Sequence, residues 1–326
     1  MTSSAPTLPQ PPNISGLNHI PAPSPESFDA EFGGLLPPGT TIPSSWGYTH
    51  YYIFKPSSPP TGRNVILVHG GGTPAIGIAP LAFALAGKGE NVVLYDTWGH
   101  GLSSTPLAPH TPALYHHQLL ELLLHFGWSS AHVLGFSLGG AIAASFTVTH
   151  PTAVESLVLV APAGLWKKSD KSWYDAFIED GGWGREWLAQ RKIIDAIEGL
   201  DARPVEGWKE RLKNGEIDPV AAQIWQMKNH RGHVASLVGS FRGGIVFDLH
   251  ETYRELSKSK METLVVLGGE DEVFPMEMMK RELLESVQWK KGMKVVDRAG
   301  HEIVRSHIGK VVEIVEEFWG GEEARK

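Results

Sequence analysis

Short apolar runs recur along the chain and alternate with stretches whose apolar residues have helical spacing. The runs suit strands buried on both faces of a sheet, and they lie at residues 64–68, 91–95, 132–134, 154–160 and 263–267. Helical spacing is found at residues 80–88, 112–126, 248–259, 275–286 and 303–319. An aromatic stretch at residues 46–54 predicts an early strand, and residues 293–296 predict a last one. This alternation predicts an α/β fold, with a mostly parallel central sheet covered by helices on both faces.

The alternation breaks between residues 165 and 244, where helical patterns are interrupted by Gly and Pro and no convincing buried strand is found. Six of the 11 tryptophans fall in this stretch. We therefore expect a helical cap inserted between two strands of the core. The predicted organisation is a Pro- and Ser-rich N-terminal arm at residues 1–43, a core made of residues 44–164 and 245–326, and a cap at residues 165–244.

The composition is that of an ordinary globular protein, with 42% hydrophobic and 20% charged residues. A formal net charge of -7 and the lack of a long basic stripe argue against a nucleic-acid partner. Because the chain has 0 Cys, disulfides and thiolate metal sites are excluded. The N-terminal residues lack the apolar run of a signal peptide, and no window is apolar enough to span a bilayer. We therefore expect a cytoplasmic protein that acts without a membrane partner.

Polar and glycine-rich residues collect at the ends of the predicted strands, where open α/β sheets gather reactive groups. They are His69 to Gly72, Asp96, Ser137, Asp271 and the pair Gly300–His301. Ser137 lies in Gly135-Phe-Ser-Leu-Gly139, the G-x-S-x-G pattern of a tight strand-turn-helix elbow. A sharp turn would expose the Ser137 hydroxyl, and the two glycines remove side chains that would collide across the turn.

Ser137 needs partners before it can act as a nucleophile, because a serine hydroxyl is weakly reactive until a base removes its proton. A carboxylate must in turn fix the tautomer and orientation of that base. His301 and Asp271 can fill these two roles. His307 is a second C-terminal histidine, but it falls inside the terminal helical pattern, whereas His301 lies in the turn after the last strand.

Five motifs together resemble the α/β-hydrolase superfamily over about residues 46–319. They are His69-Gly-Gly-Gly72, Asp96-Thr-Trp-Gly-His-Gly-Leu-Ser103, Gly135-Phe-Ser-Leu-Gly139, Gly268-Gly-Glu-Asp-Glu-Val-Phe-Pro275 and Ala299-Gly-His301. The order Ser, Asp, His along the chain is also the order found in the superfamily. The resemblance implies the α/β-hydrolase fold, with Ser137 as nucleophile, Asp271 as triad acid and His301 as general base.

The resemblance also implies an oxyanion hole made of backbone N–H groups. One donor should be Leu138, directly after the nucleophile. The second should lie in the loop after His69, with Gly71 as the first choice and Gly72 as the second. Glycine is expected there because the donor amide must face the substrate with no side chain in the way. Each donor contributes roughly 2.7–4 kcal/mol to stabilisation of the transition state.

Other titratable residues are expected to be structural. The positions of His69 and His100 resemble those of family histidines that hydrogen-bond loops behind the site, and Asp96 resembles a loop anchor. His230 and His233 have the spacing of a metal-ligand pair, but no carboxylate or cysteine of the usual arrangement accompanies them. We therefore expect a solvated loop at this pair, and no metal or other cofactor.

Substrate choice should lie in the cap, whose tryptophans could line an apolar pocket over Ser137. Trp183 and Trp187 are candidates, although their spacing of four residues also suits the cap's own core. Phe136, directly before the nucleophile, and Trp98, in another strand-end loop, complete the predicted substrate contacts.

These features predict a cofactor-free serine hydrolase that cleaves a carboxylic ester or lactone of an apolar, medium-sized small molecule through an acyl-enzyme. One alternative is a carbon–carbon bond hydrolase of the meta-cleavage type, or a cofactor-free peroxidase-like enzyme. The loop His69-Gly-Gly-Gly-Thr-Pro74 lacks the Gly-Pro-Gly that meta-cleavage enzymes tend to carry. A second alternative is a ligand receptor of hydrolase fold with little turnover. Epoxide hydrolases and haloalkane dehalogenases are disfavoured, because their nucleophile is Asp.

Overall fold

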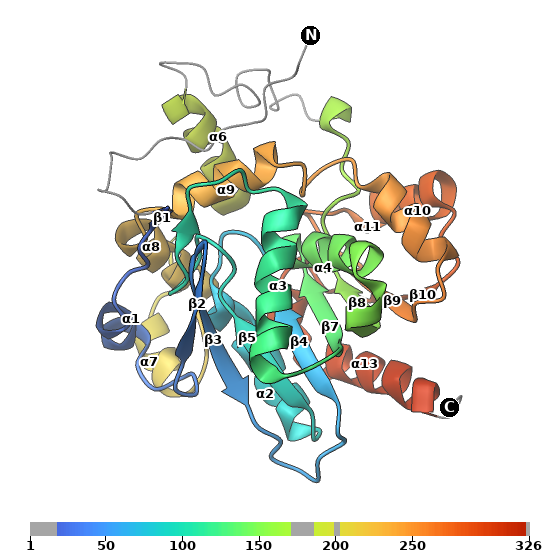
Figure 1. Cartoon of the computed structure of the whole chain (residues 1–326), viewed down its shortest axis with the longest axis horizontal. Helices are drawn as coiled ribbons and strands as arrows, with labels where there is room; N and C mark the ends of the chain where they lie inside the picture. The colour runs from blue at the N-terminus through green and yellow to red at the C-terminus, as the bar shows by residue number, and fades with distance from the viewer. Residues whose placement is uncertain (1–17, 171–185, 199–202, 324–326) are drawn as a thin grey trace.

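An eight-stranded sheet forms the centre of the computed structural model, which describes residues 18–170, 186–198 and 203–323 (Figure 1). The strand order is β10-β9-β8-β7-β4-β5-β3-β2. In chain order these strands are β2 Thr40–Ser44, β3 Gly47–Phe54, β4 Asn64–Val68, β5 Asn91–Tyr95, β7 Ala131–Phe136, β8 Val154–Val160, β9 Thr263–Gly268 and β10 Gly292–Val296. All pairs from β10 to β5 are parallel, while β3 pairs antiparallel with β5 and with β2.

The central strands are buried on both faces, as their continuous apolar runs predict. Along β4, Ile66 and Val68 face the core under α3 (Pro112–Phe126), α4 (Leu138–Thr149) and α10 (His250–Lys258). Val65 and Leu67 face the opposite core, under α2 (Ala79–Gly87), α12 (Ile303–Ser306) and α13 (Ile308–Glu323). Because successive side chains of a strand point to opposite faces of the sheet, each central strand contributes to the cores under both helical layers. The predicted α/β-hydrolase fold is confirmed.

Four of the remaining described helices form an insertion between β8 and β9. Its helices are α6 (Glu186–Glu198), α7 (Trp208–Lys213), α8 (Pro219–Asn229) and α9 (His233–Arg242), and Figure 1 places α6 and α9 above the sheet. At its base a parallel bridge pairs Trp166 with Phe247. After β9 come α11 (Met276–Arg281) and the π-helical turn η4 (Glu282–Val287). The limits given above for arm, core and cap stay a prediction.

Part of the predicted N-terminal arm forms regular structure that the apolar pattern does not reveal. Helix α1 (Pro25–Phe32) begins at the N-cap Ser24 and buries Phe28 and Phe32, four residues apart. Both rings pack against Trp225 of α8, at centroid distances of 5.1 and 6.1 Å. With eight residues and two buried side chains, α1 is too short for its periodicity to stand out. A two-residue strand, β1 (His19–Ile20), pairs with β6 (Thr105–Pro106).

The C-terminal helical pattern is divided in the structure. Residues 303–319 were expected to be one helix, but α12 ends at Ser306 and α13 begins at Ile308. His307 lies between them, with φ -130°, outside helical backbone space. Within the described residues, no helix combines the length and the apolar character needed to cross a membrane.

Candidate active site

Ser137 sits on a strained turn between β7 and α4. Its backbone has φ 54° and ψ -119°, a conformation that residues with a side chain rarely adopt. The turn is held because the Ser137 N–H donates to the Val160 carbonyl at 3.0 Å. A Cβ on Gly135 would lie 2.3 Å from the Gly139 carbonyl oxygen, and one on Gly139 would lie 2.1 Å from that of Val68. Glycine is therefore required on both sides of the turn, as the motif predicts.

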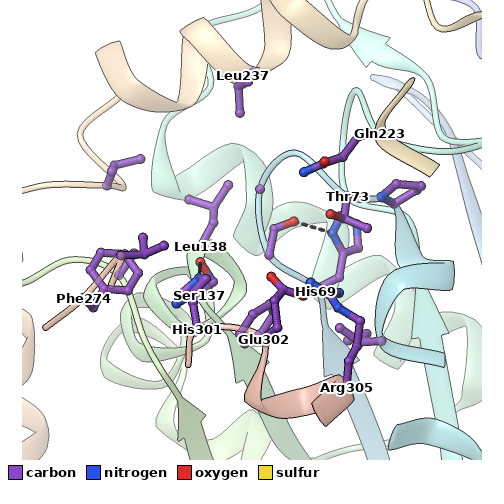
Figure 2. A pocket seen from close by; sticks show the side chains of 18 of the residues that line it. His69, Thr73, Ser137, Leu138, Gln223, Leu237, Phe274, His301, Glu302 and Arg305 are labelled. Atoms are coloured by element: carbon purple, nitrogen blue, oxygen red, sulfur yellow. Dashed lines mark hydrogen bonds and ion pairs between the residues drawn. The ribbon is translucent and has the colours of Figure 1, made fainter. Parts of the chain in front are cut away.

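The structure brings Ser137, His301 and Asp271 together from three separate strand ends. Ser137 Oγ lies 3.0 Å from His301 Nε2, and His301 Nδ1 lies 3.0 Å from Asp271 Oδ2 (Figure 2). The serine follows β7, the aspartate follows β9 and the histidine follows β10. In this arrangement a proton can pass from the serine to the imidazole while the carboxylate stabilises the resulting imidazolium.

Backbone donors orient the Asp271 carboxylate. Its Oδ1 accepts hydrogen bonds from the N–H groups of Val273 and Phe274, at 2.9 and 2.7 Å. The side chain is buried, with 2% of its surface exposed. Because these donors hold one carboxylate oxygen, the other is left to face His301.

Two aromatic rings hold the His301 imidazole in place. Phe136 lies 5.1 Å away between ring centroids, and Phe274 lies 5.2 Å away in an edge-on arrangement. Phe136 is among the predicted substrate contacts, whereas Phe274 is not. The signal for Phe274 was present, since it stands three residues after Asp271 inside the matched motif. His307 is half-buried, its Nδ1 lies 2.9 Å from Ser306 Oγ, and the structure does not bring it to Ser137.

The proposed oxyanion donors Leu138 and Gly71 both line the cavity beside Ser137. Leu138 is the first residue of α4, where N–H groups have no intrahelical acceptor and the helix dipole favours negative charge. Gly72 does not line the cavity, and its carbonyl accepts a hydrogen bond from Gln226 at 2.8 Å. This geometry favours Gly71 over Gly72. The roles themselves stay a prediction.

A cavity of about 90 Å³ opens over Ser137. Part of its wall is apolar and comes from the insertion and the strand-end loops, including Leu138, Trp166, Leu237, Phe241, Val246 and Phe274. Another part is polar and consists of Thr73, Gln223, Glu302 and Arg305. Figure 2 shows these four polar side chains to the right of Ser137 and Phe274 to its left. The size of the substrate stays a prediction.

Of the three tryptophans selected from sequence, the two that the structure describes do not line this cavity. Trp98 is fully buried and donates its indole N–H to the Leu114 carbonyl at 3.2 Å, so its ring belongs to the core. Trp187 of α6 is 58% exposed and is not among the lining residues. Trp183 lies outside the described residues. Trp166 reaches the cavity instead, because it lies at the base of the insertion and its ring packs 4.7 Å from that of Phe274.

His69 and Asp96 hold the loops behind the site. His69 Nδ1 donates to the Gly70 carbonyl at 2.6 Å, and Nε2 accepts from the Thr97 N–H at 2.9 Å. Burial lowers the pKa of His69 to about 4, so the ring is neutral at pH 7. Asp96 accepts two backbone hydrogen bonds, at 2.8 and 3.0 Å, although burial raises its pKa to about 7. These are the loop-holding contacts that the resemblance implies.

His230 and His233 are buried, which corrects the expectation of a solvated loop. They lie where α8 and α9 meet the loop after β5, and His230 Nε2 donates to the Ser103 carbonyl at 2.8 Å. The His233 ring packs 4.9 Å from that of His100, which in turn lies 5.1 Å from His69. Among the described residues, no group of three or more His, Cys, Asp or Glu side chains could hold a metal ion.

Known proteins share sequence similarity with much of this chain. A family model described as serine aminopeptidase, S33, matches residues 59–306. The dihydrolipoyllysine-residue acetyltransferase component of the acetoin cleaving system of Cupriavidus necator is 28% identical over 217 residues, which cover 65% of this chain and 53% of that protein. Lipase 1 of Psychrobacter immobilis is 27% identical over 231 residues, covering 68% of this chain and 66% of the lipase. The matched part thus spans about half of the first relative and just under two thirds of the second.

Solved structures share the fold at lower identity. The enol-lactonase from Burkholderia xenovorans LB400 is 20% identical with a TM-score of 0.62, covering 86% of this chain and 100% of that one. The 2-hydroxy-6-oxo-6-phenylhexa-2,4-dienoate hydrolase from Rhodococcus sp. strain RHA1 is 20% identical with a TM-score of 0.62, covering 86% and 98%. At this identity the likeness concerns the fold. The family model covers most of the chain, and the chain therefore belongs to the serine aminopeptidase S33 family of the α/β-hydrolase superfamily.

Proposed function

We propose that Ser137, His301 and Asp271 act as a catalytic triad that hydrolyses a carboxylic ester or lactone with a small, apolar acyl group. The observation that carries this proposal is the pair of 3.0 Å hydrogen bonds from Ser137 to His301 and from His301 to Asp271, at a cavity with an apolar wall. The strained elbow adds support, because it keeps the Ser137 hydroxyl exposed to that cavity.

The reaction follows from the positions of these groups. His301 Nε2 takes the proton of Ser137 Oγ as the oxygen attacks the substrate carbonyl carbon. The carbonyl oxygen gains the electron pair, and the N–H groups of Leu138 and Gly71 stabilise its negative charge. When the C–O bond to the alcohol breaks, His301 returns the proton to the leaving oxygen. A water molecule, deprotonated by His301, then attacks the acyl-enzyme, releases the acid and restores Ser137.

Kinetics with 4-nitrophenyl butyrate test this proposal. Ser137→Ala should lower kcat by roughly a thousandfold or more, because the nucleophile and its proton relay are lost together. His301→Asn should have a similar effect. His307→Asn is the matched control, since this second histidine lies outside the cavity, and it should keep the activity of the parent protein. If Ser137→Ala retained most of the turnover, the proposal would fail.

Assays with other substrates distinguish ester hydrolysis from the alternative functions considered above. A vinylogous diketone tests carbon–carbon bond hydrolysis, and tight ligand binding with turnover far below one per minute would indicate a receptor.

An aminopeptidase must hold the ammonium group of its substrate. In the described part of the cavity wall, the Glu302 carboxylate is already paired with the Arg305 guanidinium. We therefore expect esters to be cleaved faster than a prolyl amide.

A further inference from the structure

The polar part of the cavity wall is built differently from the apolar part. Thr73 comes from the loop between β4 and η1 (Ala75–Ile78), and Gln223 comes from α8 of the insertion. Glu302 and Arg305 come from the segment directly after His301. Four polar side chains from three separate segments thus converge on one side of Ser137 (Figure 2). A wall built only to hold an apolar group would not need them, because unpaired polar groups cost free energy when water is displaced.

Thr73 and Gln223 are free to bind a ligand. Within the described residues, neither the Thr73 hydroxyl nor the Gln223 amide has a hydrogen-bond partner. Thr73 is nevertheless buried, with 8% of its surface exposed. A hydroxyl and a primary amide each offer both donors and acceptors. They match an uncharged group with the same dual character, such as a hydroxyl.

The two charged members of this wall neutralise each other. Arg305 pairs with the Glu302 carboxylate and donates from Nη1 to the Gly77 carbonyl at 2.8 Å. Burial lowers the pKa of Arg305 to about 10, so the guanidinium keeps its charge at pH 7. An anionic ligand would have to displace Glu302 from Arg305, and a cationic ligand would have to displace Arg305 from Glu302. The wall therefore favours an uncharged ligand group that forms hydrogen bonds.

The chemistry of the triad indicates which half of the ester this wall receives. The leaving oxygen must accept its proton from His301 Nε2, so the leaving alcohol lies next to His301 during the reaction. Glu302 and Arg305 continue the chain from His301 and line the cavity on the same side as Thr73 and Gln223. The apolar wall that includes Leu237 is left for the acyl group.

We propose that the preferred substrates are esters whose acyl group is small and apolar and whose leaving alcohol carries a further hydroxyl group, bound by Thr73 and Gln223. This inference rests on the proposed ester hydrolysis at Ser137, and it adds the class of the leaving group. In the substrate complex, Thr73 and Gln223 each form a hydrogen bond with that hydroxyl, while the Glu302–Arg305 pair remains closed beside it.

Two isosteric esters test this proposal. In 2-hydroxyethyl butyrate and propyl butyrate the acyl groups are identical, and a terminal hydroxyl in one replaces a methyl group in the other. The protein should hydrolyse the hydroxyethyl ester with the higher kcat/KM. Thr73→Val and Gln223→Leu should each lower the ratio of the two kcat/KM values roughly threefold to tenfold, as expected for one lost hydrogen bond between uncharged groups.

Thr152→Val is the matched control, because Thr152 is exposed on η2 (Pro151–Ala153) and lies outside this cavity. This variant should leave the ratio unchanged. Thermal unfolding of each variant shows whether it folds, and a ratio compares two substrates on the same protein, so partial loss of folded protein cancels.

Three results would overturn the inference while leaving ester hydrolysis intact. The first is a ratio at or below one for the parent protein, and the second is a ratio that neither cavity variant changes. The third is a preference for propyl 3-hydroxybutyrate over propyl butyrate that Thr73→Val removes, which would place the hydroxyl on the acyl side. If neither ester were cleaved in a Ser137-dependent manner, the proposed function itself would fail.

Discussion

At the scale of single residues, the elbow depends on close backbone contacts that exclude any side chain. A Cβ on Gly139 would lie 2.1 Å from the Val68 carbonyl oxygen and 2.5 Å from that of His69. Both atoms belong to the backbone at the end of β4, and they cannot rotate away as the end of a flexible side chain can. Gly139 therefore sets the distance between α4 and the loop that carries Gly71.

Gly139→Ala should accordingly destabilise the protein and impair the active site together. We expect the free energy of unfolding to fall by about 1–3 kcal/mol, the usual cost of an overpacked contact. Esterase activity should fall as well, because α4 and the Gly71 loop must move apart. Denaturant unfolding and 4-nitrophenyl butyrate hydrolysis measure the two effects.

Gly87→Ala is the matched control for this substitution. A Cβ on Gly87 meets nothing within 4 Å, and Gly87 lies at the end of α2, where alanine is the better helix former. This variant should be as stable as the parent protein or slightly more stable. A Gly139→Ala protein that matched it in both measurements would contradict the packing argument.

Residues whose role depends on their position along the chain could be predicted from the sequence, whereas residues whose role depends on tertiary packing could not. Ser137, Asp271 and His301 each follow an apolar run, so the sheet topology alone predicts that they meet. Whether an aromatic ring faces a cavity, the core or solvent depends on the tertiary packing. For this reason Trp98, at a strand end, lies in the core, and Trp187 lies at the surface.

At the scale of secondary structure elements, a buried carboxylate joins both ends of the insertion. Glu282 of η4 accepts from Lys167 Nζ at 2.9 Å and from His250 Nε2 at 3.1 Å. Although burial raises the pKa of Glu282, hydrogen bonds from Ser286, Lys167, Arg281 and His250 lower it to about 2. Lys167 follows Trp166 in the cavity wall, and His250 begins α10 just after the insertion.

Glu282→Gln should loosen the base of the insertion, because the amide keeps the shape of the side chain and loses its charge. We expect a loss of about 1.5–3 kcal/mol in unfolding free energy, the range for hydrogen bonds to a charged group. The KM for butyrate esters should rise more than kcat falls, since Trp166 would shift while the triad stays in place. Glu285→Gln, exposed on the same turn, should change stability by less than about 0.5 kcal/mol. Equal behaviour of the two variants would argue against a role of Glu282 in holding the insertion.

The strands could be predicted from sequence because each central strand is a continuous apolar run between turn residues. Helix α1 could not, because its two buried side chains are covered by Trp225, which is nearly 200 positions away along the chain. The division of residues 303–319 at His307 could not be predicted either, because the apolar spacing continues across the break.

At the scale of the whole molecule, buried histidines should make stability depend on pH. Burial lowers the pKa of His50, His69, His110, His116 and His230 to about 4, and that of His100 well below its usual value. Between pH 6.5 and 4 these histidines are protonated in the unfolded chain and neutral in the folded one. Acid therefore favours unfolding over this range. Asp96, with a pKa raised to about 7, has the opposite effect on stability. It is a single group, however, whereas six histidines favour unfolding in acid.

The midpoint of thermal unfolding should accordingly fall as the pH is lowered from 6.5 to 4. Each unit of pKa difference is worth about 1.4 kcal/mol per histidine, so the change should be large. Scans in buffers of equal ionic strength measure it. A midpoint that stays level or rises between pH 6.5 and 4 would show that these imidazoles are not buried as neutral groups.

The proposed reaction depends on Ser137 acting as a nucleophile that His301 activates. Labelling with a fluorophosphonate tests it most directly, because the reagent phosphonylates an activated serine and needs no knowledge of the substrate. We expect one label per chain on the peptide that contains Ser137 and no label on Ser137→Ala. Labelling of His301→Asn should be at least a thousandfold slower, in line with the loss expected when a triad member is removed. A parent protein that stayed unlabelled, or that was labelled on another residue while Ser137 remained unmodified, would contradict it.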